Sequence, residues 1–146
     1  MTLVVDHTER LKAIDPEESF IVSAPAGSGK TGLITQRILC LLGTVNHPEE
    51  ILSITFTRKA AAEMAARVHS ALQTAANEPR PENQYEAQTW DFARKALQQD
   101  QSLNWNLLDM PNRLRIQTID SFCRYIARQF SLETKLGELS EPSDQP

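Results

Sequence analysis

The sequence is poor in residues that build disulfide-stapled, membrane-spanning or metal-centred proteins. It has only two cysteines in 146 residues, Cys40 and Cys123. Both are expected on the apolar sides of helices, as buried thiols of a reducing compartment. No apolar run is long enough to cross a membrane, and the N-terminus lacks the basic and apolar regions of a secretory signal. The histidines have no metal-ligand spacing. We therefore expect a cytoplasmic globular protein with no membrane partner.

The chain also lacks an excess of basic residues, with a net charge of −4. The distribution of charge is uneven. Four arginines oppose one aspartate between residues 110 and 130, whereas four acidic residues oppose one lysine between 131 and 146. The basic segment could bind phosphates, or its charges could simply lie on solvated helix faces. Charge alone leaves both interpretations open.

The most informative segment is a run of small residues that ends in Lys-Thr. It follows the apolar residues 20–22 and precedes a helical pattern, and it reads Ala24, Pro25, Ala26, Gly27, Ser28, Gly29, Lys30 and Thr31. A strand, such a loop and a helix in this order are typical of a phosphate-binding loop. A glycine-containing loop with an exposed lysine is the simpler alternative.

The chemistry of a triphosphate site explains this composition. Small residues let the backbone curl so that its N–H groups point at phosphate oxygens, and the helix that follows adds its positive dipole end. Lys30 would reach the β- and γ-phosphates, and the Thr31 hydroxyl would ligate Mg²⁺. The strict pattern has glycine at the position of Ala24. Alanine is tolerated there if its φ is ordinary, because only a positive φ demands glycine.

Hydrophobic periodicity predicts strands that alternate with helices. Strands are expected at 20–23, 51–56 and 115–118, and helices at 6–14, 31–42, 59–76, 85–97 and 119–130. Gly43 fits a helix C-cap, and prolines make 77–83 a loop. Residues 100–111 are expected to be irregular or short-helical. This alternation predicts an α/β fold, in which helices flank a parallel sheet.

Two further segments directly follow predicted strands. Phe56, Thr57, Arg58 and Lys59 leave the second strand, and residues 117–122 leave the third. Ligands gather at the carboxyl ends of parallel strands, so the first segment offers a base-stacking ring and phosphate contacts. Taken singly, each segment is explained as well by helix N-capping and core aromatics.

Together the three segments resemble a known family. Residues 20–31 (FIVSAPAGSGKT), 54–64 (ITFTRKAAAEM) and 116–123 (IQTIDSFC) are similar, in order and spacing, to motifs I, Ia and Ib of superfamily 1 DNA helicases of the UvrD/RecB/AddA group. The second motif is the most diagnostic. The Ala-Pro-Ala start of the loop and the form of the third motif favour the RecB/AddA helicase–nuclease branch. The resemblance runs from about residue 9 to residue 130.

The resemblance implies a P-loop NTPase of RecA-like fold, incomplete in this chain. Residues 1–130 would form the first part of the motor domain, with a helical insertion at 77–112 and a flexible tail at 131–146. It implies ATP and Mg²⁺ as cofactors, with Lys30 and Thr31 as catalytic residues, and Arg10 in the place of a glutamine that reads adenine. The residues implied for the track of single-stranded DNA are Phe56, Thr57, Arg58, Lys59, Thr118, Asp120, Ser121 and Phe122.

The resemblance also implies 3′-to-5′ translocation in DNA recombination or repair, with the remainder of a helicase chain and other helicase–nuclease subunits as partners. No apolar run that ends in Asp-Glu follows the third motif. That pair would hold Mg²⁺ and polarise the attacking water. We therefore expect weak ATP binding without hydrolysis. The alternatives are another P-loop enzyme, such as a small-molecule kinase, or a non-catalytic nucleic-acid-binding module.

Overall fold

The computed structural model describes residues 7–130; the predicted tail at 131–146 and its acidic cluster lie outside them. The described part is mostly helical, with a small parallel sheet. Its elements are α1 (His7–Ile14), α2 (Lys30–Leu42), η1 (Pro48–Glu50), β1 (Leu52–Thr55), α3 (Arg58–Asn77), α4 (Gln84–Leu103), η2 (Pro111–Arg113), β2 (Arg115–Thr118) and α5 (Ile119–Gln129). The predicted α/β fold is thus seen only in part, as a two-stranded parallel sheet beside a mainly helical body.

Side-chain caps explain where three of the helices begin. The Thr57 hydroxyl accepts a hydrogen bond from the Ala60 N–H and starts α3 directly after β1. Asn83 caps α4 in the same way, and Thr118 caps α5 directly after β2. Because each cap satisfies an N–H that the helix itself cannot, it sets the turn at which strand or loop becomes helix. Gly43 closes α2 as predicted.

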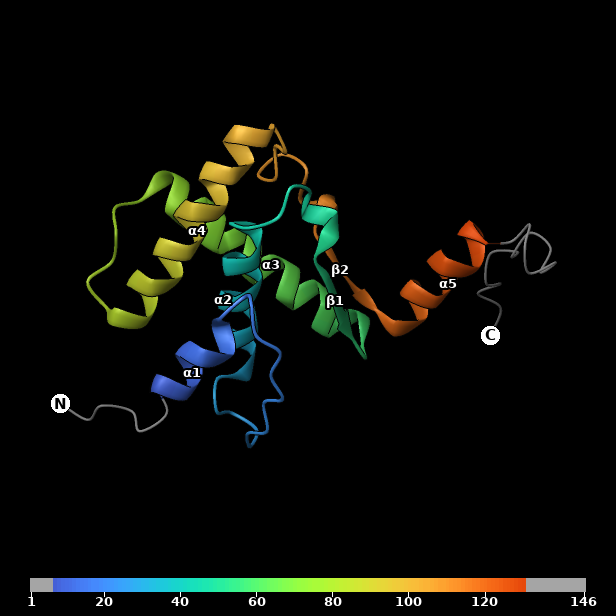
Figure 1. Cartoon of the computed structure of the whole chain (residues 1–146), viewed down its shortest axis with the longest axis horizontal. Helices are drawn as coiled ribbons and strands as arrows, with labels where there is room; N and C mark the ends of the chain where they lie inside the picture. The colour runs from blue at the N-terminus through green and yellow to red at the C-terminus, as the bar shows by residue number, and fades with distance from the viewer. Residues whose placement is uncertain (1–6, 131–146) are drawn as a thin grey trace.

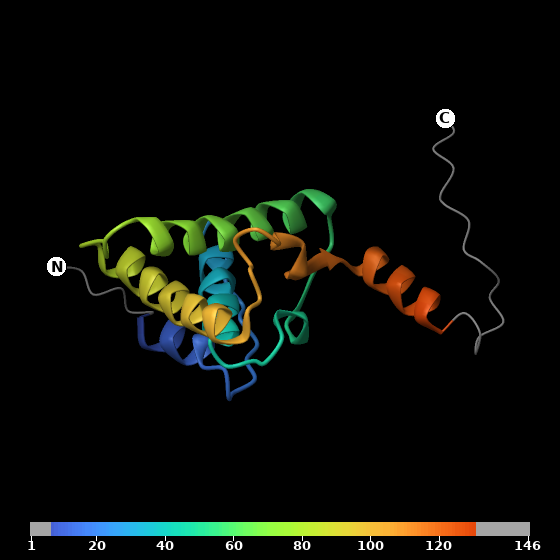
Figure 2. The same ribbon diagram turned by 90° about the horizontal axis from the view of Figure 1, so that it is seen from above.

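The core lies where α2, α3 and α4 pack together (Figures 1 and 2). Each helix contributes an apolar stripe at helical spacing, as the periodicity predicts. The most deeply buried members of the core are Ile38, Leu39, Leu42, Val68, Leu72, Ala75, Ala93, Ala96, Trp105 and Leu107. The small residues of α4 let it approach its neighbours closely. A second, smaller cluster joins Ala13 and Ile14 of α1 to Leu33 of α2.

The sheet consists of β1 and β2, which pair in parallel from Leu52↔Arg115 to Thr55↔Thr118. Both strands were predicted, and α3 packs against them (Figure 1). Parallel pairing places the carboxyl ends of β1 and β2 at one edge. The segments that follow the two strands therefore leave the sheet side by side.

The predicted first strand, residues 20–23, is wrong for this structure. The segment has no strand geometry, and the side chains of Phe20, Ile21 and Val22 are 41%, 100% and 47% exposed. An apolar run becomes a strand only when a neighbouring backbone satisfies its N–H and C=O groups. The sheet of the described residues has two strands, and neither pairs with this segment.

Two helices also differ from the prediction. α4 continues six residues past the predicted end at 97, to Leu103, and stops where Asn104 adopts a left-handed φ of 54°. The apolar stripe of α5 is not buried, because α5 projects from the helical body and meets it mainly at the strands (Figure 2). Cys123, on that helix, is exposed, which corrects the expectation of a buried thiol. Cys40 is half-buried, and burial raises its pKa.

An ion pair ties together the connections that lead into β1 and β2. Arg113 donates from Nε to Glu49 Oε1 at 2.7 Å and from Nη2 to Oε2 at 3.1 Å. Arg113 Nη1 also donates to the Trp105 carbonyl at 2.9 Å. One of the four arginines of the basic segment is therefore paired within the protein. The two-pronged contact suits the planar guanidinium.

Acidification should weaken this pair. The hydrogen bonds from Arg113 hold the pKa of Glu49 below its ordinary value of 4.5, so the folded state binds fewer protons than the unfolded chain. The stabilisation is present above pH 4.5 and is lost as the pH falls through the lowered pKa. We expect Glu49→Gln to lower the free energy of unfolding by up to about 1 kcal/mol near neutral pH. Urea unfolding at several pH values should show the two proteins converging in acid.

Candidate functional site

The segment before α2 curls into a compact loop. Ser28 N–H donates to the Pro25 carbonyl at 3.3 Å, which closes a turn. Gly27 and Gly29 have φ values of 80° and 84°, in the left-handed region that favours glycine. Such turns gather successive N–H groups on one side of the backbone, where they can bind an anion. The loop therefore has the conformation that its composition predicts.

The alanine at the first position of the loop is compatible with this conformation. Among described residues other than glycine, only Asn104 and Asn106 have a positive φ. Ala24 therefore does not need the conformational freedom of glycine. The departure from the strict pattern causes no backbone strain at that residue.

The loop leads directly into the N-terminus of α2. Gly29 is the N-cap, and its carbonyl accepts the Leu33 N–H at 3.1 Å. Lys30 folds back across the loop, and its ammonium group donates a hydrogen bond to the Ala24 carbonyl. Thr31 is exposed on the first turn. The ammonium group and the positive end of the helix dipole thus lie at the same place, as anion binding requires.

A pocket of about 380 Å³ adjoins the loop and is lined by Glu9, Arg10, Ala13, residues 20–25, Ser28, Lys30 and Leu33. The Ser28 hydroxyl is buried without a hydrogen-bond partner among the described residues. Buried polar atoms usually have a partner, so this hydroxyl is available to an incoming ligand. Nowhere in residues 7–130 do three His, Cys, Asp or Glu side chains cluster as metal ligands.

Arg10 contacts the loop from α1. Its Nη1 donates to the Ser28 carbonyl at 3.2 Å and its Nη2 to the Gly29 carbonyl at 3.3 Å. The predicted nucleotide residue Arg10 therefore does lie at the loop pocket. Both of these contacts are with main-chain oxygens of the loop itself.

Arg37, which was not predicted as a site residue, supports the same region. It donates to the carbonyls of Ala13, Asp15 and Glu18 at 2.7–2.8 Å, and it lies over the Phe20 ring at 5.8 Å. It thereby ties α2 to the chain segment that leads into the loop. The feature that could have pointed to it is its place in the sequence, where Arg37 is a single basic residue two helical turns after Lys30 within an apolar helical pattern.

The two remaining motifs meet at the carboxyl edge of the sheet (Figure 1). The Phe56 side chain is 89% exposed, and Arg58 and Lys59 are exposed beside it at the start of α3. Thr118 is buried, accepting from Ser121 N–H at 3.2 Å and donating to its hydroxyl at 2.9 Å. Asp120 and Ser121 are exposed, and Phe122 is half-buried. None of these residues lines the loop pocket.

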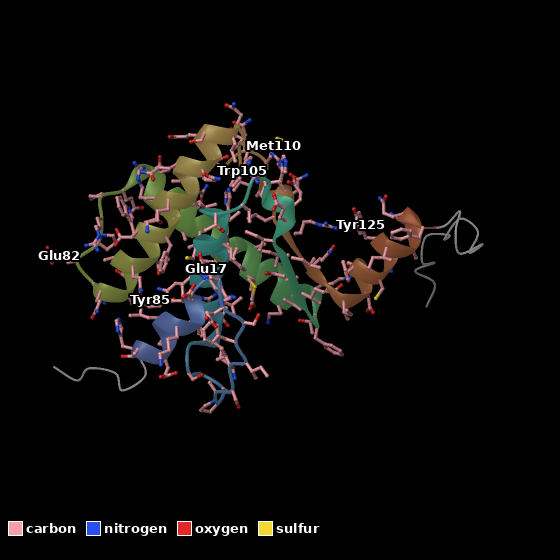
Figure 3. All side chains as sticks on the ribbon, viewed as in Figure 1. Glu17, Glu82, Tyr85, Trp105, Met110 and Tyr125 are labelled. Atoms are coloured by element: carbon pink, nitrogen blue, oxygen red, sulfur yellow. The ribbon has the colours of Figure 1, made fainter. Side chains whose placement is uncertain are left out.

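N-capping explains Thr57 and Thr118, as the simpler interpretation of these segments predicts. It does not explain the exposed ring of Phe56. A core aromatic would be buried, and this ring is not. Arg115 lies in β2, and its Cζ is 4.5 Å from the centroid of the Tyr125 ring on α5. Tyr125 is labelled in Figure 3.

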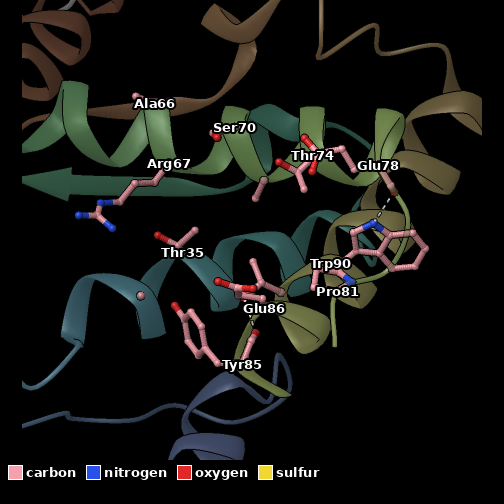
Figure 4. Close-up of a pocket in the computed structure, with 13 residues that line it drawn as sticks. Thr35, Ala66, Arg67, Ser70, Thr74, Glu78, Pro81, Tyr85, Glu86 and Trp90 are labelled. Atoms are coloured by element: carbon pink, nitrogen blue, oxygen red, sulfur yellow. Dashed lines mark hydrogen bonds between the residues drawn. The ribbon is translucent and has the colours of Figure 1, made fainter. Parts of the chain in front are cut away.

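A larger pocket, of about 590 Å³, lies among α2, α3 and α4 (Figure 4). Thr35, Arg67, Tyr85, Glu86 and Trp90 are among the side chains that line it. Gly32 permits the close approach of Tyr85, since a Cβ on Gly32 would lie 2.2 Å from the Tyr85 hydroxyl. This pocket contains no glycine-built turn of amides, so the loop pocket is the better candidate for a triphosphate.

A glycine-built loop at the N-terminus of a helix that begins with Lys-Thr defines the phosphate-binding-loop class of proteins. Within that class, the chain belongs to the UvrD/REP helicase N-terminal domain family. The sequence model of this family matches residues 6–144 of the chain. The family implies a RecA-like fold. The described residues form five α-helices and a two-stranded parallel sheet.

Curated relatives agree with the family. The chain is 33% identical over 130 residues to an ATP-dependent helicase/nuclease subunit of Lactobacillus acidophilus, covering 88% of this chain and 9% of that protein. It is 35% identical over 119 residues to the protein of the same name from Clostridioides difficile. This match covers 79% of this chain and 8% of that protein. The chain thus spans less than a tenth of the length of these relatives. No solved structure matches the chain. No helix within residues 7–130 is both long and apolar enough to span a bilayer.

Proposed function

We propose that this chain is the nucleotide-binding N-terminal part of an ATP-dependent DNA helicase motor of the helicase–nuclease type. Residues 1–130 would form the front of the motor domain, with 77–112 as a helical insertion. The observation that carries the proposal is the curled loop, in which two left-handed glycines precede a lysine at a helix N-terminus. The match to helicase/nuclease proteins over most of this chain supports it.

ATP would bind with its phosphates in the loop. Main-chain N–H groups between Ala24 and Thr31 would bind the phosphate oxygens. Lys30 would exchange the Ala24 carbonyl for the β- and γ-phosphates, because a charged acceptor makes the stronger hydrogen bond. Thr31 would ligate Mg²⁺ from the first turn of α2, and Arg10 lies where it can contact the bound nucleotide.

Single-stranded DNA would lie across the carboxyl edge of the sheet. A base would stack on Phe56, and Arg58 and Lys59 would contact backbone phosphates. The N-termini of α3 and α5, near Thr57 and Thr118, point positive dipole ends at the same edge. Asp120, Ser121 and Phe122 would complete this track from the first turn of α5.

We expect this chain to bind ATP without hydrolysing it. The sequence contains no Asp-Glu dipeptide, the pair that would hold Mg²⁺ and polarise water. Hydrolysis, and 3′-to-5′ movement along DNA in recombination or repair, would need the remainder of a helicase chain. Other helicase–nuclease subunits would be its further partners.

Replacing Phe56 by alanine should weaken binding of single-stranded oligonucleotides by about tenfold. Stacking of one base on an aromatic ring contributes about 1–3 kcal/mol. The free energy of unfolding should stay within about 0.5 kcal/mol, because the ring makes little contact with the protein. Fluorescence anisotropy with a labelled deoxythymidine oligonucleotide measures the first effect, and urea unfolding the second.

Tyr85→Ala is the matched control, because Tyr85 is an exposed aromatic residue on α4, away from the sheet edge. It should leave oligonucleotide affinity unchanged. Equal losses in both variants, or no loss in Phe56→Ala, would reject the proposed track. Binding of the wild type should also weaken steeply with salt, as phosphate contacts require.

A further inference from the structure

We infer that Arg10 is a positioning residue that holds the phosphate loop in its binding conformation by contacting the loop's carbonyls, whatever base the nucleotide carries. The inference rests on the proposed nucleotide function and concerns the same site. It differs from the adenine-reading role that the resemblance implies for a glutamine at the place of Arg10. The two roles predict different ligand dependences, so they can be separated.

Arg10 makes two hydrogen bonds to the main chain of the loop. Nη1 and Nη2 donate to two successive carbonyls, those of Ser28 and Gly29, at 3.2 and 3.3 Å. These carbonyls directly precede Lys30, the residue that would contact the terminal phosphates. The rigid guanidinium fork presents two donors in one plane, so it can hold two neighbouring carbonyls at a set spacing.

The conformation of the loop makes such a hold useful. Gly27 and Gly29 have positive φ, and glycine loses more conformational freedom on ordering than any other residue. A loop built from them is therefore costly to keep in one shape. Hydrogen bonds from Arg10 to the carbonyls of this loop offset part of that cost before the ligand arrives. Because Arg10 contacts only carbonyls, it does not compete with an anion for the N–H groups of the loop.

Gly29 leaves room for the guanidinium at this contact. A Cβ built on Gly29 would lie 3.3 Å from Arg10 Nη2 and 3.4 Å from Nη1. Glycine at this position therefore serves the left-handed backbone and also leaves space for the guanidinium. Arg10 and Gly29 fit each other closely.

The helix that carries Arg10 is anchored without it. Ala13 and Ile14 are 8% and 3% exposed and pack against Leu33 of α2. Arg37 donates to the carbonyl of Ala13, at the end of α1, at 2.7 Å. Substitutions of Arg10 should therefore leave α1 in place and change the loop alone.

The test compares three ligands, ATP·Mg²⁺, GTP·Mg²⁺ and inorganic tripolyphosphate·Mg²⁺, by calorimetric titration of the full 146-residue chain. We expect Arg10→Ala to weaken all three by the same factor, about tenfold, the size of one charge-assisted hydrogen bond. Arg10→Lys, which keeps a cationic donor, should recover part of the loss for all three. The unfolding midpoint without ligand should fall only slightly, because the two bonds order one loop and leave the helical core intact.

Lys12→Ala is the control for charge. Lys12 lies on the same helix, and its ammonium group pairs with the exposed Glu9 carboxylate at 3.1 Å. Lys12→Ala should leave the affinity for all three ligands unchanged. An equal loss in Lys12→Ala would show a general effect of charge and overturn the inference.

Three other results would contradict the proposed role of Arg10. If Arg10→Ala weakens ATP but not tripolyphosphate, Arg10 contacts the base and the inference is wrong, while the proposed function stands. If Arg10→Ala binds all three ligands like the wild type, the hold on the loop has no effect and the inference is wrong. If the wild type binds neither ATP nor tripolyphosphate, the proposed function fails and the inference fails with it.

Discussion

Lys30→Ala should lower the affinity of this chain for ATP·Mg²⁺ by about 10- to 100-fold. Hydrogen bonds to charged groups contribute about 1.5–3 kcal/mol each, and Lys30 would contact two phosphates. The ammonium group already lies over the loop, on the Ala24 carbonyl, so binding needs only an exchange of acceptor. Equilibrium titration with a fluorescent ATP analogue measures the loss.

Lys59→Ala is a matched control, because Lys59 is also a lysine in the first turn of a helix. No glycine-built loop precedes it, so ATP affinity should be unchanged. If Lys30→Ala binds ATP like the wild type, the loop is not the nucleotide site and a non-catalytic nucleic-acid-binding module becomes the better interpretation. A phosphate-release assay should show no ATP turnover by the wild type or by Lys30→Ala. Turnover by the wild type that Lys30→Ala abolishes would overturn the expected lack of hydrolysis.

Trp105→Ala should lower the free energy of unfolding by about 3–5 kcal/mol, the usual cost of deleting a buried tryptophan. Trp105 is 2% exposed and packs in the core with Leu42 and Leu107, just past the end of α4 (Figure 3). Its Nε1 also donates to the Asn46 carbonyl at 2.9 Å. Deletion would leave both a cavity and an unpaired carbonyl, and it could take much of the stability of a domain of this size.

Trp105→Phe separates the two effects. It keeps most of the apolar volume and loses the N–H, so its cost should be clearly smaller than that of alanine. Urea unfolding monitored by far-UV circular dichroism compares the variants. A cost of less than about 1 kcal/mol for Trp105→Ala would mean that this core does not carry the stability of the domain.

Features of this fold that depend on local interactions could be predicted, and features that depend on long-range contacts could not. The helices α2, α3 and α5 were predicted to within a residue at each end, because their stripes and their caps at Thr57 and Thr118 are local. β1 and β2 were predicted for the same reason. The strand at 20–23 failed because a strand needs a partner, which an apolar run cannot reveal. The burial of the α5 stripe failed because amphipathicity shows which face can be covered, not whether anything covers it.

The candidate site divides in the same way. Its loop could be predicted residue by residue, because the small residues and Lys30 act within one turn of chain. The contacts of Arg10 and Arg37 could not, since they join residues 18 to 24 positions apart in sequence. The family, too, could be inferred from motif order alone, and the comparison confirms it.

The amino-acid sequence by itself determined the family, the loop composition, and most of the helices and strands, because these depend on neighbours within a few turns of chain. Only the tertiary structure decided that Phe56 is exposed, that Arg113 pairs with Glu49, and that Arg10 contacts the phosphate loop. Each of these depends on how distant elements pack. Packing is the sum of many weak contacts, and local sequence patterns do not encode that sum.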